Sequence, residues 1–468
     1  MGIKGKMRFK RKERGKSLKY FLLGTVGVLA VAAIVWVLVA KLEGEAPRIV
    51  MDLESGHIPA RVEIPVTVYD EKSGIRKVFA SLVQDGREVT LANRTYGQSM
   101  PGGESGVHAL DLTLSIDVRE KGLKDGEALL RIAAWDLSWR QWFSGNLTYM
   151  EKEIVIDSIP PRITVLSRQH NLSQGGSGLV VYRLSEPCEK HGVRVGEEFF
   201  QGHSGFYKDE DIFLALIALS HEQGSETSIS LLAEDKAGNQ GQSGLHYYIQ
   251  NRAFDSENLN ISDNFLRQTL PEFQSVAGFP VDKPPIDQFL FINRDLRNKD
   301  SEILLSLYKD SANTFYWEGD FMALPRAQRR AGFADQRTYI YNGEAIGQSV
   351  HLGVDLASLR HAPVPAANAG KVVFCDWAGI YGNTVVIDHG YGLMSLYSHL
   401  SGIDVQKGDF VAKGDIIGNT GMTGLAVGDH LHFSVIVGNV FVNPYEWWDA
   451  AWIQNNITGK LDEITQRL

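Results

Sequence analysis

The chain has 468 residues, 44% of them hydrophobic and 22% charged, which is typical of a globular protein of about three domains. Its formal net charge is −9, although residues 1–19 hold nine Lys or Arg and one Glu, so the remainder is strongly acidic. An acidic body argues against nucleic acid as a partner, because phosphate binding requires a basic surface. Cys188 and Cys375 lack neighbours at metal-ligand spacing, which excludes a cysteine-type zinc site but leaves a disulfide open.

The first predicted element is a membrane helix at residues 20–40, which carry no charge. A helix of that length spans roughly 31 Å, the thickness of the hydrocarbon layer. The basic segment 1–19 before it predicts a cytoplasmic N-terminus, with everything after the helix outside. A cleaved signal peptide is the alternative, but the apolar run is long for one and Leu38-Val-Ala40 is a poor cleavage sequence. We therefore predict an uncleaved, single-pass anchor.

Residues 45–157 and 158–250 are predicted to be two copies of one β module. Ala46-Pro-Arg-Ile49 opens the first and Pro160-Pro-Arg-Ile163 opens the second. Short alternating apolar runs separated by turn residues predict antiparallel sandwiches. The stretch 233–239, Ala-Glu-Asp-Lys-Ala-Gly-Asn, resembles a late strand of bacterial immunoglobulin-like domains. Neither copy shows a cluster with catalytic spacing, so we interpret them as spacers or as binding modules for protein partners.

Residues 251–330 are predicted to form a small helical connector. Apolar residues recur at helical spacing from Asp263 and again from Ile286, with prolines between the two runs. A regulatory arm that covers the active site is the alternative interpretation. From residue 331 to 450, many short strand-like runs separated by glycines predict a compact antiparallel β-sandwich, followed by a tail at 451–468. The predicted fold class is thus mainly β.

Four of the thirteen histidines and one aspartate lie in three short motifs of this last domain. His430 and His432 are two apart, so on a strand they project from the same face. His351 and Asp355 are four apart and also share a face if the chain is extended. Two imidazoles and one carboxylate leave a fourth position on zinc for water, as a catalytic site requires.

These motifs resemble those of the lysostaphin/LytM-type zinc metallopeptidases, which cut peptidoglycan cross-links. His351-x-x-x-Asp355, Ser398-His399-Leu and His430-x-His432 occur in the same order, and the glycine pattern between them agrees over about 332–448. The resemblance implies that His351, Asp355 and His432 hold one Zn²⁺ per chain. It also implies that His399 and His430 are catalytic, one as general base and both as stabilisers of the oxyanion. The sequence leaves open which of the two is the base.

Other residues near these motifs receive weaker interpretations. Arg337 is a candidate for orienting the metal ligands without binding the metal itself, and His389 is expected to be structural. Tyr381 and Asn383 line a groove or shape a turn. Ala334 departs from the resemblance, because many relatives have a glycine after the phenylalanine, and His361 is assigned no role.

The predicted function is therefore a peptidoglycan endopeptidase held on the bacterial cytoplasmic (inner) membrane, with its catalytic domain in the periplasm or outside the cell. A non-catalytic wall-binding or amidase-activating protein is the main alternative, although such relatives typically lose metal ligands and none is lost here. A lipoyl- or biotin-carrier domain, with Lys413 near a hairpin turn, would leave the histidines unexplained.

Overall fold

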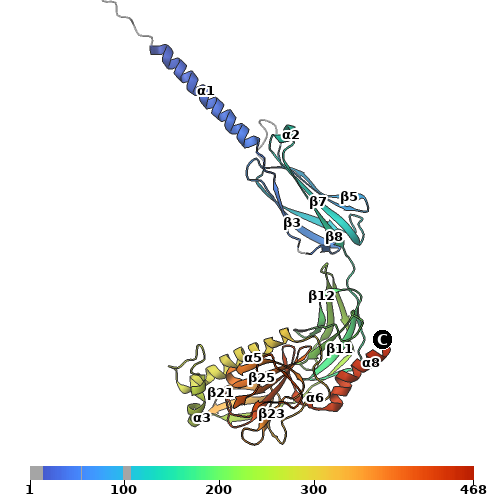
Figure 1. Ribbon diagram of the computed structural model, residues 1–468, viewed down its shortest axis with the longest axis vertical. Helices are drawn as coiled ribbons and strands as arrows, with labels where there is room; N and C mark the ends of the chain where they lie inside the picture. The colour runs from blue at the N-terminus through green and yellow to red at the C-terminus, as the bar shows by residue number, and fades with distance from the viewer. Residues whose placement is uncertain (1–13, 54, 98–106) are drawn as a thin grey trace, which may run out of the picture. The chain divides into compact units, whose positions relative to one another are not determined.

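The computed structural model describes residues 14–53, 55–97 and 107–468 (Figure 1). Most of the predicted basic segment therefore lies outside the described residues. The chain divides into two compact units, Met1–Ile159 with Lys236–Asn239 and Pro160–Asp235 with Gln240–Leu468. Strands predominate in both units, which confirms the prediction of a mainly β chain.

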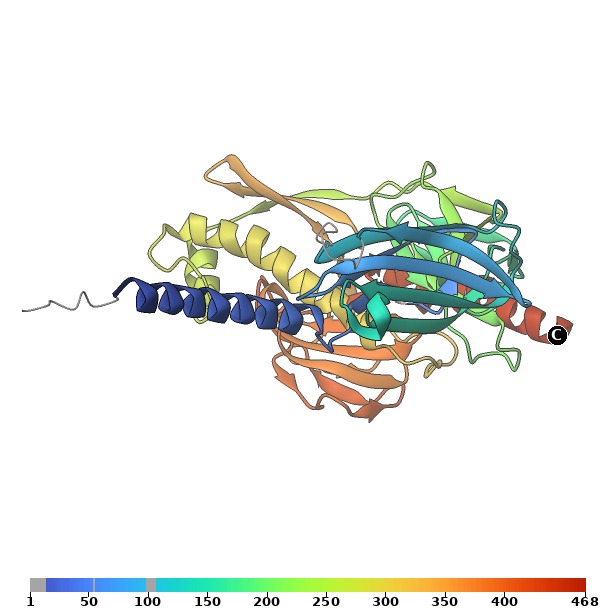
Figure 2. The same ribbon diagram turned by 90° about the horizontal axis from the view of Figure 1, so that it is seen from above.

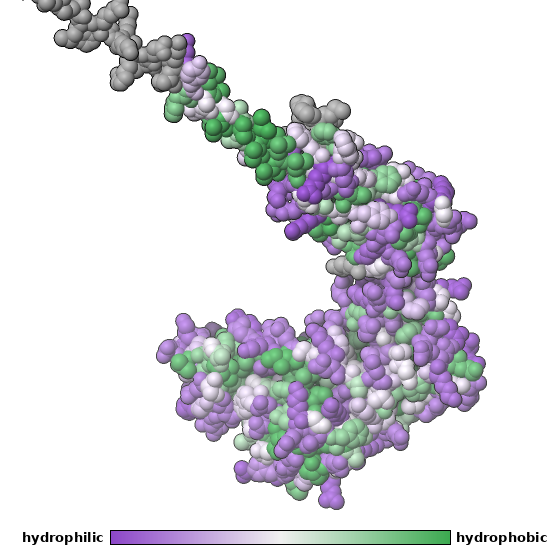
Figure 3. Space-filling view, turned by 45° about the horizontal axis from the view of Figure 1, so that its top comes forward, coloured by the Kyte–Doolittle hydropathy of each residue, from purple (hydrophilic) through white to green (hydrophobic). Residues whose placement is uncertain are grey.

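Helix α1 (Arg14–Lys41) begins the first unit. Its stretch Lys19–Val39 is long and apolar enough to cross a membrane, and the same composition is found in anchors and in signal sequences. No part of this stretch is buried against the protein, and its surface is the continuous hydrophobic band of Figure 3.

The rest of the first unit consists of two sheets around one core. The three-stranded sheet has the order β1-β3-β6 and the five-stranded sheet the order β2-β8-β7-β4-β5. In β3, Ile64, Val66 and Val68 alternate with exposed residues and face the core, as the two-residue period of a strand requires. The elements are β1 (Arg48–Met51), β2 (His57–Ile58), β3 (Arg61–Tyr69), β4 (Ile75–Gln84), β5 (Arg87–Thr95), β6 (Ala109–Asp117), β7 (Gly126–Asp136), α2 (Arg140–Phe143) and β8 (Leu147–Ile156).

The second unit begins with sheets in the orders β14-β11-β9, β13-β12-β15-β16 and β10-β17. Their strands are β9 (Ile163–Val165), β10 (His170–Ser173), β11 (Ser177–Leu184), β12 (Cys188–Val195), β13 (Glu198–Gln201), β14 (Ile212–Ala218), β15 (Ile229–Asp235), β16 (Gln240–Gly244) and β17 (Tyr247–Gln250). Cys188, at the start of β12, and Cys375 are both free thiols.

The segment after β17 differs from the predicted helical connector, because it starts with a strand. It contains β18 (Ser256–Asn260), α3 (Asp263–Thr269), η1 (Leu270–Phe273), α4 (Pro285–Phe291), η2 (Ile292–Leu296), α5 (Arg297–Ser306) and η3 (Leu307–Asp310). Strand β18 is mostly polar, so its sequence gives no strand signal, and it pairs in parallel with β20. The run from α4 to α5 lies alongside the C-terminal sheet (Figure 2), where Asp300 accepts a hydrogen bond from Ile380 N at 2.9 Å.

The C-terminal region is built on one long sheet. Its order is β19-β22-β30-β26-β25-β24-β28, with β31 paired to β30, and the small sheets β18-β20-β21 and β23-β29-β27 flank it. The strands are β19 (Gln328–Ala331), β20 (Asp335–Tyr341), β21 (Glu344–His351), β22 (Val354–Ala357), β23 (Pro363–Pro365), β24 (Gly370–Trp377), β25 (Asn383–Gly390), β26 (Leu393–Ser398), β27 (Gly402–Ile403), β28 (Phe410–Val411), β29 (Ile416–Asn419), β30 (Leu431–Val437) and β31 (Val440–Val442). The short helix η4 (Gly379–Tyr381) joins β24 to β25.

The expected C-terminal tail is helical and packed. It comprises α7 (Ala450–Ile453), η5 (Gln454–Thr458) and α8 (Gly459–Arg467), after α6 (Pro444–Trp448). Ile453, Ile457, Leu461 and Ile464 recur at helical spacing and are buried in the same hydrophobic core as β11, α5 and β30. This shared core explains why residues 160–468, apart from 236–239, form one unit.

Glu446 in α6 is a buried acid that faces β11 within this unit. Its Oε2 accepts hydrogen bonds from Ser177 N at 2.8 Å and Ser177 Oγ at 3.3 Å. Burial raises the pKa of Glu446 to about 7, which the Ser177 hydrogen bonds only partly offset. The folded state therefore holds this proton more tightly than the unfolded state, so stability falls as pH rises from about 4.5 towards 7.

We expect Glu446→Gln to make the protein more stable than the wild type above pH 7, by on the order of 1–3 kcal/mol, because glutamine never ionises. Unfolding temperatures of both proteins at pH 5 and pH 8 measure this effect. The difference in unfolding temperature between variant and wild type should favour the variant more at pH 8 than at pH 5. An equal difference at the two pH values would contradict the raised pKa assigned to Glu446.

Candidate active site

Pairing of three strands brings the sequence motifs together. Strand β22 runs antiparallel to β30, and their register places Asp355 directly opposite His432. Strand β26 pairs with the other edge of β30, with Ser398 opposite His432, so His399 follows at the end of that strand. His351 ends β21, which pairs with β20.

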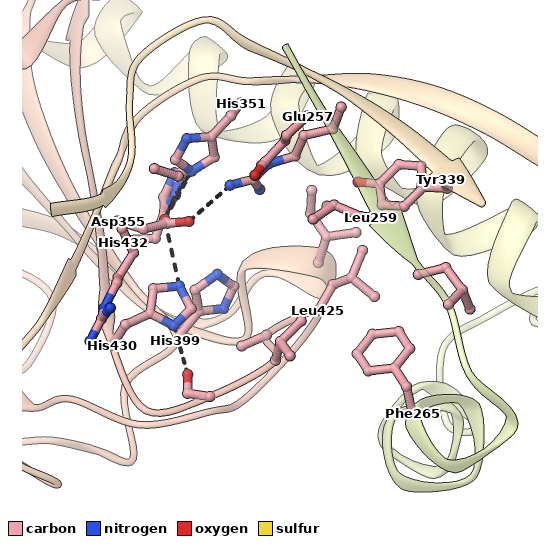
Figure 4. Close-up of a pocket in the computed structure, with 18 of the residues that line it drawn as sticks. Glu257, Leu259, Phe265, Tyr339, His351, Asp355, His399, Leu425, His430 and His432 are labelled. Carbon is pink, nitrogen blue, oxygen red and sulfur yellow. Dashed lines mark hydrogen bonds and ion pairs between the residues drawn. The ribbon is translucent and has the colours of Figure 1, made fainter. Parts of the chain in front are cut away.

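The three predicted metal ligands meet at one point (Figure 4). His351 Nε2 lies 2.8 Å from Asp355 Oδ1 and 2.9 Å from His432 Nδ1, and His432 Nδ1 lies 2.9 Å from Asp355 Oδ1. All three side chains are buried, and they form a group that could hold a metal ion. Two imidazole nitrogens and one carboxylate oxygen are the donor set of many catalytic zinc sites.

Each ligand is held in place through its other polar atom. His351 Nδ1 donates to Gly332 O at 2.7 Å, and His432 Nε2 lies 3.0 Å from Ser434 Oγ. Arg337 Nη2 donates to Asp355 Oδ2 at 3.1 Å, so Oδ1 stays directed at the two histidines. Outer hydrogen bonds of this kind fix the orientation and tautomer of metal ligands. The residues present therefore fit a zinc ion.

His399 and His430 lie beside this group, and each uses its Nδ1 to hydrogen-bond a backbone carbonyl. His399 Nδ1 donates to Thr423 O at 2.8 Å, and His430 Nδ1 donates to Gly428 O at 2.7 Å. Backbone carbonyls only accept, so Nδ1 carries the hydrogen in both neutral rings and Nε2 remains an acceptor. The ring centroids are 4.8 Å apart. His399 has φ +62°, a left-handed conformation that is rare outside glycine and costs backbone strain.

The electrostatic surroundings distinguish the two histidines. Burial lowers the pKa of His399 well below its usual value, and His430 and His432 lower it further. Burial also acts against the charged form of His430. However, the hydrogen bond and charge of Asp355, whose Oδ1 lies 3.5 Å from His430 Nε2, outweigh burial and raise the pKa of His430. The surroundings therefore shift the two pKa values in opposite directions, that of His399 downward and that of His430 upward.

The five residues line a cavity of about 600 Å³. Leu259 of β18, Phe265 of α3, Tyr339 of β20 and Leu425 form an apolar portion beside the histidines (Figure 4). The segment that precedes the domain therefore contributes part of the cavity wall. A cavity with an apolar portion next to convergent polar groups is typical of a binding site for part of a substrate.

The weaker candidates fall into two groups. Tyr381 is buried and lines the cavity, whereas Asn383 shapes a turn by donating from Nδ2 to Leu400 O at 3.0 Å. His389 is buried away from the cavity, with its ring nitrogens 2.7 Å from Ala369 O and 2.7 Å from Ser395 Oγ, so its predicted structural role fits the contacts. Ala334 has φ +63°, a conformation that glycine adopts more readily than alanine, so a glycine would suit this turn.

Sequence reasoning missed one residue that reaches the site through Arg337. Glu257 Oε1 accepts a hydrogen bond from Arg337 Nε at 2.8 Å, so the guanidinium bridges Glu257 of β18 and Asp355 of β22. Glu257 and Asp355 are 98 positions apart in the sequence, and strand β18 is not predicted from its polar residues. Only the parallel pairing of β18 with β20, which sets Glu257 beside Arg337, brings them together.

We expect Arg337→Met to weaken zinc binding about 10- to 100-fold, because Asp355 would lose the partner that orients it. Titration with a zinc chelator of known affinity measures this change. Arg294→Met is the matched control, since Arg294 is exposed and pairs with Asp295. Unchanged zinc affinity in Arg337→Met would contradict a positioning role.

Comparison with known proteins assigns the domain that carries this site. Residues 349–444 match the family described as Peptidase family M23, so the chain contains an M23 peptidase domain. The resemblance to lysostaphin/LytM-type peptidases is thereby confirmed.

The individual relatives named here each match only part of this chain. The chain is 39% identical over 95 residues to "DD-carboxypeptidase/endopeptidase Mpg" of Neisseria meningitidis, covering 20% of this chain and 22% of that protein. It is 43% identical over 93 residues to "Peptidoglycan DD-endopeptidase ShyA" of Vibrio cholerae, covering 20% and 22%. The solved catalytic domain of lysostaphin from Staphylococcus simulans is 29% identical, with a TM-score of 0.24, covering 28% of this chain and 98% of that domain. The curated relatives are thus matched over about a fifth of their length.

Proposed function

We propose that the protein is a zinc-dependent endopeptidase that hydrolyses peptide bonds of peptidoglycan. The observation that carries the proposal is the convergence of His351, Asp355 and His432 beside His399 and His430 in an M23 domain. The Vibrio cholerae relative named "Peptidoglycan DD-endopeptidase ShyA" supports the substrate class.

The chain's own residues account for the proton transfers. His399 Nε2 is neutral and accepts a proton from the attacking water, because its Nδ1 is committed to Thr423 O. His430, when its Nε2 is protonated, donates a hydrogen bond from that nitrogen to the oxyanion that forms at the scissile carbonyl. Zinc bound by His351, Asp355 and His432 would polarise that carbonyl and lower the pKa of water.

We further propose that α1 is an uncleaved membrane anchor with the following residues outside the cytoplasm. Peptidoglycan lies outside the cytoplasmic membrane, so the hydrolase must be exported to reach it. On this proposal the β modules at 45–157 and 158–250 set the reach of the site from the membrane or bind protein partners. The exposed apolar surface of Lys19–Val39 and the basic segment before it support the arrangement.

Digestion of purified, cross-linked peptidoglycan by the full chain in detergent tests the function. The zinc-loaded protein should release soluble peptide-bearing fragments, and removal of zinc followed by its return should abolish and restore the release. Zinc binding without any release would contradict the proposal and favour a wall-binding or amidase-activating protein.

A further inference from the structure

A second group of buried acids lies in the first unit, away from the peptidase domain. Glu43 follows α1 by two residues, Asp70 directly follows β3, and Asp136 ends β7. An oxygen of each lies within 4.8 Å of an oxygen of both others. The exposed fractions are 6% for Glu43, 4% for Asp70 and 0% for Asp136. Three carboxylates this close and this buried repel one another unless a cation lies between them.

Hydrogen bonds fix two of these carboxylates without neutralising them. Asp136 Oδ1 accepts from Asn146 N at 2.7 Å and from Ser138 N at 3.0 Å, and its Oδ2 accepts from Asn146 Nδ2 at 2.7 Å. Asp70 Oδ1 accepts from Gly74 N at 2.6 Å. These donors are uncharged amides, so the negative charges remain.

Two polar atoms at the group have no hydrogen-bond partner in the described part of the chain. Glu43 Oε1 accepts from Ser73 N at 2.7 Å, but Glu43 Oε2 is buried and unpartnered. Ser73 Oγ, on a side chain that is 5% exposed, is buried close enough to Glu43 to lower the pKa of that carboxyl, but it has no partner at full hydrogen-bond geometry among the described residues. Leaving such atoms without a partner is costly, so each is a marker of a missing ligand.

The nearby basic residues Arg76 and Lys72 are attracted to Asp136 and Glu43, but each is directed at another partner. Arg76 is attracted to Asp136, but its Nη2 donates to Ser144 O and its Nε has no partner. Lys72 pairs instead with Glu45, which is exposed, at 3.0 Å. Among the described residues no salt bridge joins Glu43, Asp70 or Asp136 to a basic side chain. Burial, together with the neighbouring Asp70 and Asp136, raises the pKa of Glu43.

We propose that Glu43, Asp70 and Asp136 bind a Ca²⁺ ion, with Ser73 Oγ as a further oxygen ligand. The donors are all oxygens, which suits a hard cation, whereas zinc and copper favour nitrogen or sulfur. Ca²⁺ tolerates an irregular set of six to eight oxygens, and Mg²⁺ demands a near-ideal octahedron. Ligands from three separate segments, one just after the helix and two at strand ends, form such an irregular set.

Acidic residues recur at matching positions just before and within the second β module. Glu43 lies three residues before Ala46-Pro-Arg-Ile49, and Asp157 lies three residues before Pro160-Pro-Arg-Ile163. Asp136 ends β7 in the first copy, and Asp235 ends β15 in the second. Acids at matching positions of the two copies indicate a shared requirement for them, and cation binding is one that the geometry of Glu43, Asp70 and Asp136 supports.

Bound Ca²⁺ would tie the segment that leaves α1 to the first β module. Glu43 is the only one of the three acids that lies in that segment, and the other two belong to the sheets. Extracellular modules bind Ca²⁺ with dissociation constants of about 10⁻⁴ to 10⁻³ M. These residues lie outside the peptidase domain, so their binding of Ca²⁺ can be tested independently of the proposed hydrolase activity.

Calcium titration of the zinc-loaded full chain in detergent tests the site, with zinc content measured before and after. Wild type should bind Ca²⁺ with a dissociation constant in the range above, and Glu43→Gln should bind one equivalent fewer or bind it at least tenfold more weakly. Glu63→Gln, which removes an exposed acid of β3, is the matched control and should bind as wild type.

A second measurement guards against a variant that folds poorly. Millimolar Ca²⁺ should raise the unfolding temperature of the wild type and of Glu63→Gln, and should have a smaller effect on Glu43→Gln. A wild type that neither binds nor is stabilised by millimolar Ca²⁺ would overturn the proposal. Equal binding by wild type and Glu43→Gln would overturn it as well.

Discussion

Replacing His432 by alanine should remove the bound zinc and lower the rate of cross-link hydrolysis by at least about a thousandfold. The ring is one of three converging ligands, and its loss leaves His351 and Asp355 as an incomplete set. Polarisation of the scissile carbonyl by zinc contributes several kcal/mol, and about 4 kcal/mol corresponds to a thousandfold in rate. Metal analysis and the rate of muropeptide cleavage, both on the full-length variant, measure the two effects together.

The control for this variant is His389→Ala, which removes a buried histidine of the same domain that does not face the cavity. It should keep its zinc even if its stability falls. Full zinc occupancy in His432→Ala would mean that the ion is held elsewhere, and the assignment of the metal group would then be wrong.

Replacing His399 by alanine should lower the turnover number by about 10²- to 10⁴-fold while zinc stays bound. In the proposed mechanism this residue supplies the neutral Nε2 that accepts a proton, and it lies outside the group of three converging side chains. Zinc content and turnover of the purified variant separate this effect from loss of the ion. His432→Ala, in contrast, should lose both.

His430→Ala provides the comparison that assigns the base. His430 is the better proton donor, because Asp355 favours its charged form, so its loss should weaken stabilisation of the oxyanion and leave the base in place. Added imidazole should therefore restore activity to His399→Ala more effectively than to His430→Ala. Rescue of His430→Ala alone would reverse the two roles.

The sequence was informative about the site because strand geometry is simple. The two-residue period of a strand places His430 and His432 on one face, and the motifs that resemble lysostaphin and LytM fix the order of the five residues. The structure brings all five together, as His432 pairs across from Asp355. Their catalytic and metal-binding roles remain predictions that the variants above test.

Other features depend on contacts that no local pattern encodes. Strand β18 has the sequence Ser-Glu-Asn-Leu-Asn, whose polar residues predict a loop, and only pairing with β20 makes it a strand. The hydrogen bond from Arg337 to Glu257 follows from that pairing. The three acids of the first module are separated by 27 and 66 residues, so only the closing of both sheets brings them together.

The structure indicates how a regulatory role for residues 251–330 can be tested. Phe289, Ile292, Leu296 and Leu304 are buried in the core shared with the peptidase domain. Deleting residues 251–315 would remove these side chains and is expected to unfold the unit rather than expose the site. Substitutions at the cavity wall, such as Phe265→Ala, are the better means to ask whether the segment restrains access.

The central claim is that residues 351–432 form a zinc-dependent site for peptidoglycan peptides. Mass analysis of defined, cross-linked muropeptide dimers, incubated with the full chain before and after zinc removal, tests it most directly. The zinc-loaded protein should convert dimers to monomers whose masses include one added water, and the zinc-free protein should leave the dimers intact. Intact dimers with zinc bound, or cleavage that persists without zinc, would contradict the claim.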